Sequence, residues 1–419
     1  MKAILVSVRL KRNFSDELLA SAEELSRLAS TAGIETVCTV AVKRSQWDPA
    51  TLIGSGKIEE IKKIAGESNA DLIIFDEELT PAQQRNLEKA FGGIMVSTRT
   101  RLIIEIFSGR AKTREGRLQA QLAELSYNLT RLTGRGLSMD QQHGMIGGRG
   151  AGERKKEYDR RILRNKINDL KKDIEEIKKE RKIQRASRTS VPLPQIAIVG
   201  YTNAGKSTFL NYLTKDRHGI YADDKLFATL DPSTKRVHMP SGGDVLFTDT
   251  VGFIQRLPHT LIAAFRATLE EIHYSDLILH VHDYSSPDAK IQHEAVKKTL
   301  KEIGVIDIPV INVFNKADAV KDRIYAWAPA SLRPVFISAV TGEGIPELLK
   351  KCENVLSERW KEYTETIPAE KKKLIQFLYS CCLVGRTEYT ENGISVTFKA
   401  TKENYARFRK RLLSAEDSF

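Results

Sequence analysis

The sequence predicts a multidomain α/β protein: a parallel α/β domain, a helical-hairpin coiled coil, a P-loop nucleotide-binding α/β domain and a small α+β module. Apolar strands alternate with amphipathic helices over residues 1–108. Two stripes with coiled-coil spacing lie within residues 109–190. A glycine-rich loop joins an apolar strand to a helix within residues 191–357, and a hairpin pattern occurs within residues 366–419. Together these patterns predict that order of domains.

The first domain is predicted from strands and helices that alternate along the chain, an order typical of a parallel sheet. The predicted strands are Ile4–Val8, Thr36–Val42, Leu72–Phe75 and Ile94–Val96, and the predicted helices are Asp16–Ala32, Ile58–Gly66 and Ala82–Phe91. Within this domain Gly54-Ser55-Gly56-Lys57 resembles a phosphate loop, but it lacks the Ser or Thr after lysine and the glycine spacing. We expect a turn that starts a helix there; a second nucleotide site stays open as the alternative.

Two helices with narrow apolar stripes are predicted to pair as an antiparallel hairpin. The stripes repeat at spacings of four and three, and their members are Leu118, Leu122, Leu125, Leu129 and Leu132, and Leu163, Ile167, Leu170, Ile174 and Ile177. Each arm is expected to hold about 25 residues and to extend roughly 35 to 40 Å at 1.5 Å per residue.

The tip of this hairpin, residues 133–153, contains seven glycines together with Arg135, His143 and Arg149. Loops of this length are usually functional or disordered. The following residues, 154–188, hold 15 Lys and Arg against 7 Asp and Glu. Such a stalk suits structured RNA, because phosphates supply affinity while arginines and backbone amides contact irregular bases. A solvated helix face is the alternative, above all at Asp169–Glu180.

A complete G-x-x-x-x-G-K-[ST] phosphate loop, Gly200–Ser207, follows the apolar run Gln195–Val199 and precedes the predicted helix Thr208–Leu213. Backbone N–H groups of such a loop surround the phosphates, while Lys206 supplies positive charge and the Ser207 hydroxyl binds Mg²⁺. The predicted contacts are Gly200, Tyr201, Thr202, Asn203, Ala204, Gly205, Lys206, Ser207 and Thr208.

A second apolar run, Val310–Phe314, leads into a segment that selects the base. The Asp318 carboxylate can accept from both N1–H and the exocyclic amine of guanine, whereas adenine has an acceptor at N1. GTP is therefore the predicted nucleotide. The expected contacts are Asn315, Lys316, Ala317 and Asp318, and, after the strand Val335–Ile337, Ser338, Ala339 and Val340.

Two segments between these motifs are predicted to sense the γ-phosphate. Asp249, Thr250, Val251 and Gly252 follow the strand Val245–Thr248, and Phe227, Ala228, Thr229 and Leu230 lie upstream. Ser207, Thr229 and Asp249 are the predicted Mg²⁺ ligands, and the Gly252 N–H would face the γ-phosphate. Catalysis is assigned to Lys206, Thr229 and Gly252. A structural turn or cap is the alternative for Thr229.

Phe253 stands where the best-known small GTPases have a glutamine that orients the attacking water. An apolar ring cannot form that hydrogen bond, so we expect slow hydrolysis by the chain alone. A partner, or K⁺ held near Asn203, would accelerate it. Equal hydrolysis rates in potassium and sodium buffers would contradict the role of K⁺.

These segments resemble the HflX family of ribosome-associated GTPases, within the Obg-HflX group. The resemblance rests on Gly200–Ser207, Phe227–Pro232, Asp249–Ile254, Phe75–Leu79, Pro81–Leu87 and Gly147–Glu153. It covers most of the chain, although Arg154–Glu157 departs from the Thr-Gln-Leu-Glu usual in the family. It implies a partner in the large ribosomal subunit and its rRNA, a hairpin tip that reaches the peptidyl-transferase region, and a role in splitting or rescuing stalled ribosomes.

Composition agrees with a protein that binds a polyanion in the cytoplasm. The net charge is +12 and the isoelectric point is about 9.3. The four cysteines have neither zinc-site spacing nor a disulfide pattern, and no apolar run approaches 18 residues. We expect a soluble, cytoplasmic monomer with reduced cysteines.

The last module, residues 366–419, is predicted from a helical pattern that begins at Lys371, a hairpin and a basic helix. The hairpin strands Thr387–Tyr389 and Ile394–Phe398 flank Asn392-Gly393, and the helix is Glu403–Leu413. Docking to a partner and capping of the nucleotide domain are equally compatible roles.

Two other functions remain compatible with the sequence. An ATP-dependent RNA-remodelling factor would need adenine chemistry in residues 1–108. A signalling GTPase would use the leucine seam to bind a protein. Binding to an RNA backbone weakens steeply with salt, whereas a leucine-seam interface does not, so salt dependence distinguishes the partners.

Overall fold

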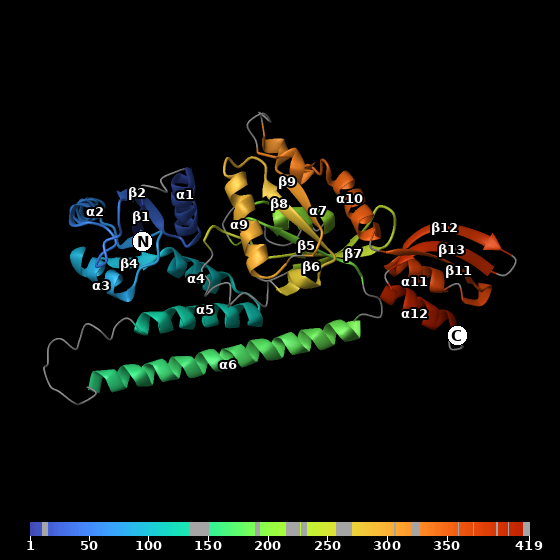
Figure 1. Cartoon of the computed structure of the whole chain (residues 1–419), viewed down its shortest axis with the longest axis horizontal. Helices are drawn as coiled ribbons and strands as arrows, with labels where there is room; N and C mark the ends of the chain where they lie inside the picture. The colour runs from blue at the N-terminus through green and yellow to red at the C-terminus, as the bar shows by residue number, and fades with distance from the viewer. Residues whose placement is uncertain are drawn as a thin grey trace. The chain divides into compact units, whose positions relative to one another are not determined.

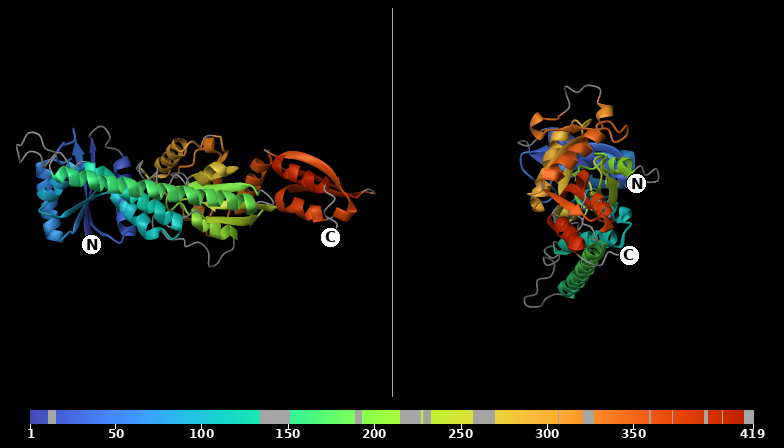
Figure 2. Two further views of the ribbon diagram at one scale, coloured as in Figure 1. Left: turned by 90° about the horizontal axis from the view of Figure 1, so that it is seen from below. Right: turned by 90° about the vertical axis from the view of Figure 1, so that its right-hand side faces the viewer.

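The computed structural model describes residues 1–10, 16–133, 151–188, 193–214, 227, 233–256, 270–305, 307–320, 327–358, 360–371, 373–390, 393–400 and 402–413. It divides into two compact units. Figures 1 and 2 show the helices and strands, coloured from the N-terminus to the C-terminus. The first contains Met1–Lys178, Asp223–Asp231 and Gln255–Ala267, and the second contains the remainder of the chain. No helix among the described residues is long and apolar enough to cross a bilayer.

The first unit is built on a parallel four-stranded sheet with the order β2-β1-β3-β4. Its elements are β1 (Lys2–Leu10), α1 (Asp16–Thr31), β2 (Glu35–Arg44), α2 (Ser55–Ser68), β3 (Leu72–Phe75), α3 (Pro81–Ala90), β4 (Met95–Thr98) and α4 (Arg99–Arg110). The predicted strands and helices are thus confirmed. Helix α3 begins at Pro81, one residue before the predicted start, because Thr80 and Gln83 form a capping box there.

The segment Gly54–Lys57 starts a helix, as expected. Gly54 is the N-cap of α2, and the Lys57 ammonium pairs with Glu60 at 2.7 Å. The residues therefore form an ordinary helix start with a surface ion pair.

Helices α5 (Arg114–Thr133) and α6 (Ala151–Arg188) form the predicted helical hairpin (Figure 1). Ile167 and Ile174 of the predicted stripe are buried, with 7% of each residue exposed to solvent. The expectation of two equal arms was wrong, because α5 has 20 residues and α6 has 38. Helix α6 continues without interruption to Arg188. No Gly or Pro occurs from residue 153 to 188 to interrupt it.

The nucleotide domain contains a six-stranded sheet of order β10-β9-β8-β5-β7-β6, parallel except for β6. Its elements are β5 (Gln195–Gly200), α7 (Lys206–Thr214), β6 (Ser233–His238), β7 (Asp244–Asp249), β8 (Leu277–Asp283), α9 (Ala289–Glu302), β9 (Val310–Asn315), β10 (Val335–Phe336) and α10 (Ile345–Glu358). Residues of α7 and α10, among them Phe209 and Leu348, share one core with Leu279 and Val281 of β8.

The C-terminal module is an antiparallel sheet of order β11-β13-β12 with two helices. Its elements are β11 (Lys361–Ile367), α11 (Lys373–Cys381), β12 (Leu383–Thr390), β13 (Gly393–Ala400) and α12 (Lys402–Leu413). The predicted hairpin and final helix are confirmed. Strand β11 was not predicted. Leu378, Val396, Phe398 and Phe408 form the centre of the core.

Candidate nucleotide-binding site

The predicted phosphate loop connects the end of β5 to the start of α7, so α7 presents its N-terminal N–H groups to the loop. Both flanking glycines are required by close backbone approach. A Cβ at Gly200 would lie 2.3 Å from the Val281 carbonyl oxygen, and one at Gly205 would lie 2.2 Å from Asn315 Nδ2. Gly205 also has φ of +86°, which favours glycine.

The Lys206 ammonium lies along the inside of this loop. Its Nζ donates to the carbonyl oxygens of Gly200 (3.1 Å) and Tyr201 (2.8 Å), and the side chain is buried. Burial lowers the pKa of Lys206 from 10.5 to about 8, although the nearby Asp249 carboxylate opposes the shift. A polyphosphate would favour the charged form of this lysine.

Nucleotide affinity is therefore expected to depend on pH. Above about pH 8 Lys206 is neutral in the free protein, so binding must take up a proton, and affinity for GDP should fall by up to about tenfold per pH unit. The Lys206→Met variant should bind GDP weakly, and its affinity should change with pH only through the titration of the nucleotide itself. Dissociation constants for GDP, measured for both proteins between pH 7 and 9.5, test this. Parallel pH profiles of the two proteins would contradict the assignment.

Two predicted Mg²⁺ ligands lie together beside the loop. Ser207 Oγ donates to Asp249 Oδ2 at 2.7 Å, where α7 begins and β7 ends. A hydroxyl and a fully buried carboxylate are hard oxygen donors, which fit Mg²⁺ together with phosphate oxygens. The residues present thus suit the ion that P-loop GTPases typically use.

The segment after Asp249 packs directly on the phosphate loop. Thr250 Oγ1 donates to the Ile198 carbonyl at 2.8 Å. A Cβ at Gly252 would lie 3.1 Å from Lys206 Nζ and 2.8 Å from Thr202 Cγ2. Val251, the residue before Gly252, is also buried. The Gly252 backbone is consequently beside the lysine that would bind the γ-phosphate.

Phe253 is held by its backbone and buries its ring. Its N–H donates to the Gly200 carbonyl at 3.1 Å, and its carbonyl accepts from the Thr202 N–H at 2.8 Å. Only 2% of the residue is exposed. The ring can neither bind nor orient a water molecule, in agreement with the expectation from sequence.

Asn315 joins the base-recognition segment to the phosphate loop. Its Nδ2 donates to the Ala204 carbonyl at 2.9 Å, and its Oδ1 accepts from the Ala339 N–H at 2.9 Å. The segment of Ser338, Ala339 and Val340 is thereby fixed next to β9, with Val340 exposed and Ser338 buried.

Asp318, the predicted partner of guanine, is exposed to solvent. Ala317 is fixed by its N–H, which donates to the Ile337 carbonyl at 3.1 Å. Lys316 adopts φ of 65°, and its Nζ donates to Asp283 Oδ2 at 2.7 Å. Asp283 was missed by the sequence analysis. Its position at the carboxyl end of a buried parallel strand, β8, was the available signal.

Among the predicted contacts Phe227–Leu230, the structure describes Phe227. Phe227 is buried in the first unit, where its ring lies 4.4 Å from the Phe107 ring of α4. Ala228, Thr229 and Leu230 lie outside the described residues.

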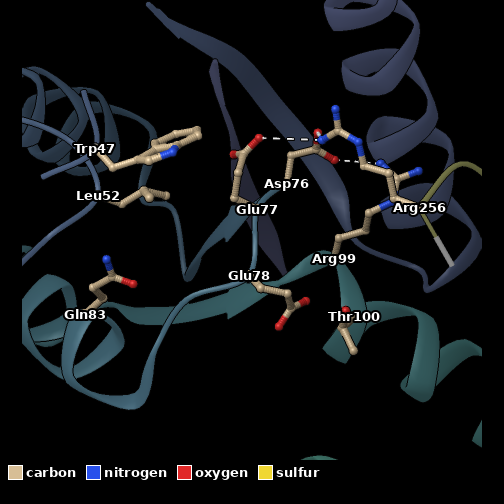
Figure 3. Close-up of a pocket in the computed structure, with 9 residues that line it drawn as sticks. All are labelled: Trp47, Leu52, Asp76, Glu77, Glu78, Gln83, Arg99, Thr100 and Arg256. Atoms are coloured by element: carbon tan, nitrogen blue, oxygen red, sulfur yellow. Dashed lines mark hydrogen bonds and ion pairs between the residues drawn. The ribbon is translucent and has the colours of Figure 1, made fainter. Parts of the chain in front are cut away.

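The first unit contains a separate cavity of about 510 Å³ at the carboxyl ends of β3 and β4 (Figure 3). Its acidic groups are already compensated. Asp76 accepts from Arg9 (2.7 Å) and Arg99 (2.6 Å), and the Arg256 guanidinium lies 3.6 Å from Asp76 and 3.8 Å from Glu77. Arg256, four residues after Gly252, therefore belongs to the ion network of this unit. The lining residues are Trp47, Leu52, Asp76, Glu77, Glu78, Gln83, Arg99, Thr100 and Arg256.

Four family models match consecutive parts of the chain. They are described as GTP-binding GTPase N-terminal (residues 20–108), GTP-binding GTPase Middle Region (110–188), 50S ribosome-binding GTPase (195–316) and HflX C-terminal domain (324–418). Each matches a different part, and together they extend over the hairpin, the nucleotide domain and the C-terminal module.

Similar proteins named GTPase HflX extend over nearly the whole length. The relative from Lacrimispora saccharolytica is 45% identical over 97% of this chain and 95% of its own. That from Caldanaerobacter subterraneus is 42% identical over 99% and 94%, and that from Escherichia coli is 38% identical over 94% and 91%. With this likeness over its full length and a complete phosphate loop, the chain belongs to the HflX family of GTPases.

Proposed function

We propose that this HflX GTPase binds the large ribosomal subunit through its hairpin and uses GTP to control that binding. The supporting observation is the basic surface of α6 near the hairpin tip. Arg161, Arg164 and Lys166 are exposed there, and the acidic residues between positions 157 and 166 are Glu157 and Asp159. The family model that matches residues 195–316 is described as a 50S ribosome-binding GTPase, which points to the same partner. Ribosomal RNA phosphates are the complementary surface.

GTP is recognised in this proposal by the residues that surround the phosphate loop. Asp318 accepts from guanine, Lys206 binds the β- and γ-phosphates, and the Gly252 N–H faces the γ-phosphate. Ser207 and Asp249 would hold Mg²⁺, together with Thr229, and the bound ion would supply positive charge beside the phosphates.

Hydrolysis by the chain alone would be slow, because Phe253 cannot orient water. The large subunit would accelerate it by supplying or ordering the missing group, and K⁺ near Asn203 would add positive charge at the phosphates. The positive φ of Asn203, 61°, places this residue in a tight turn of the loop.

The nucleotide state would be communicated along the chain from Gly252 to Arg256. Ordering of the segment by the γ-phosphate would reposition Arg256 relative to Asp76 and Glu77 and favour the arrangement of domains that binds the ribosome. Hydrolysis would reverse this and release the protein. With the tip at the peptidyl-transferase region, the cycle would serve to split or rescue stalled ribosomes.

We propose that the protein acts as a monomer in the cytoplasm and that its four domains are residues 1–108, 109–190, 191–357 and 366–419.

Removal of the three exposed cations from α6 should weaken binding to large subunits and flatten its salt dependence. In the variant Arg161→Gln, Arg164→Gln, Lys166→Gln, the slope of log affinity against log salt should decrease by about one for each phosphate that is no longer neutralised. Sedimentation binding assays at several salt concentrations measure this slope in the presence of a non-hydrolysable GTP analogue.

The matched control replaces Lys171, Lys172 and Lys179 by Gln; these lysines are exposed on the same helix, in its charge-balanced part. The control removes the same charge as the first variant and should retain most of the salt dependence of the unmodified protein. If both triple variants lose affinity equally, binding depends on the net charge of the protein, and the surface formed by Arg161, Arg164 and Lys166 is not the binding site. An unchanged slope in the first variant would favour a protein partner.

A further inference from the structure

Three buried histidines, none of them assigned to GTP, meet between β8 and α9. His280 and His282 alternate along β8 and so point to the same face of the sheet, while His293 comes from the second turn of α9. Their exposed fractions are 3%, 3% and 7%. The rings of His280 and His282 have centroids 3.9 Å apart, and the ring of His293 lies 5.2 Å from each.

The ring nitrogens of this cluster lie close together. One ligand atom from each histidine lies within 4.8 Å of those from the other two. Nδ1 of His293 is buried and has no hydrogen-bond partner among the residues that the structure describes. A buried polar atom without a partner destabilises the folded state, and a metal ion that accepts the lone pair of this nitrogen would remove that penalty.

We propose that His280, His282 and His293 form a binding site for Zn²⁺. Imidazole nitrogen is a preferred ligand of this ion, and three histidines with a fourth position for water make a known type of zinc site. Bonds of about 2.0–2.1 Å in a tetrahedral arrangement place ligand nitrogens about 3.4 Å apart. The rings of His280 and His293 are stacked with an angle of 14° between their planes. Because an imidazole lone pair lies in the plane of its ring, these rings would rotate on binding so that their nitrogens face the ion.

The protonation state suits a metal. Burial lowers the pKa of each of the three histidines, that of His282 to about 4, so all are neutral at pH 7. The charged groups around the cluster are Glu294, whose carboxylate lies 3.9 Å from His293 Nε2, and the cations Lys297 and Lys206. Glu294 would offset part of the charge of the ion, and bound nucleotide would neutralise Lys206.

The surroundings would orient the ligands. His282 Nε2 lies 3.3 Å from Asn312 Oδ1, an arrangement that assigns the proton to Nε2 and leaves Nδ1 for the metal. The Phe314 ring stacks on His282 at 4.6 Å, and the Trp327 ring lies 5.2 Å from His293. The ion would fix α9 to β8 immediately before Asp283, the partner of Lys316.

The test is zinc binding by the full chain saturated with GDP and excess Mg²⁺, which occupy the nucleotide site. Titration against a competing chromophoric chelator should show one Zn²⁺ per chain. His293→Gln and His282→Gln should each weaken this binding by about 100-fold or more. The matched control His238→Gln alters a histidine whose side chain is 75% exposed on β6, and it should bind zinc as the unmodified protein does.

A second measurement does not depend on the folding of any variant. Co²⁺ added to the unmodified protein should give the visible absorption of a tetrahedral site with nitrogen ligands, and equimolar Zn²⁺ should abolish it. No stoichiometric zinc, no such absorption, or zinc retained by folded His293→Gln and His282→Gln would each overturn the proposal. The cluster would then be a stack of neutral rings.

Discussion

Asp318→Asn is expected to weaken GTP binding by about 100-fold or more. The carboxylate would accept two hydrogen bonds from guanine, and bonds to a charged group contribute about 1.5–3 kcal/mol each. The amide has one acceptor and presents N–H where guanine also donates. Because an amide N–H can donate to the 2-oxo group of xanthine, the same variant should bind xanthosine triphosphate better than the unmodified protein does. Fluorescence titration measures the affinities of both proteins for GTP and for xanthosine triphosphate.

Asp169→Asn is the control, since its carboxylate is exposed on α6 and takes no part in the nucleotide domain. It should leave both affinities unchanged. If Asp318→Asn weakens GTP and xanthosine triphosphate alike, the loop has been damaged. Equal GTP affinity in Asp318→Asn and the unmodified protein would remove Asp318 from base recognition.

Asp76→Asn is expected to destabilise the first unit by about 3–5 kcal/mol, the usual cost of removing one partner from a buried ion pair. The Asp76 side chain is fully buried and accepts from Arg9, Ser21 and Arg99 at 2.6 to 2.7 Å. Arg99, itself 2% exposed, also pairs with Glu24. Hydrogen exchange of the β1 and β3 amides measures the local free energy of opening. Glu60→Gln, which removes only the surface pair with Lys57, should cost less than about 1 kcal/mol.

The pH dependence of this effect has a definite sign. Burial raises the pKa of Asp76, but Arg99, Ser21 and Arg9 outweigh it and hold the pKa below its ordinary value of 3.8. The carboxylate therefore stabilises the fold above about pH 4 and loses this contribution as the pH falls further. The difference between Asp76→Asn and the unmodified protein should shrink below pH 4. A difference independent of pH would contradict the role of the charge.

Helices and strands could be predicted where their own residues form an apolar run, a periodic pattern or a motif of fixed spacing. The run Leu72–Phe75 is confirmed as β3, and the phosphate loop lies between β5 and α7 as its spacing requires. Strand β11 escaped prediction because its sequence, KEYTETI, is rich in charge and threonine. It is fixed by pairing with β13, about 30 residues later, which local propensity does not register.

The same limit applies within the sites. The roles of Asn315 and Lys206 could be predicted from motif spacing, whereas the pairing of Asp283 with Lys316 depends on the register of β8 beside β9. Likewise, Asp76 and Arg99 are buried together only because β3 and β4 are adjacent and parallel. Contacts of this kind follow from tertiary structure and leave no periodic signal in the sequence.

The central claim is that the large ribosomal subunit is both partner and activator of this GTPase. Its most direct test is the rate of GTP hydrolysis with and without purified large subunits, for the unmodified chain and for a variant in which a short Gly-Ser linker replaces residues 134–150. We expect strong stimulation of the unmodified chain, and a variant that binds GDP normally but loses the stimulation. Absence of stimulation of the unmodified chain would contradict the account and favour a protein partner.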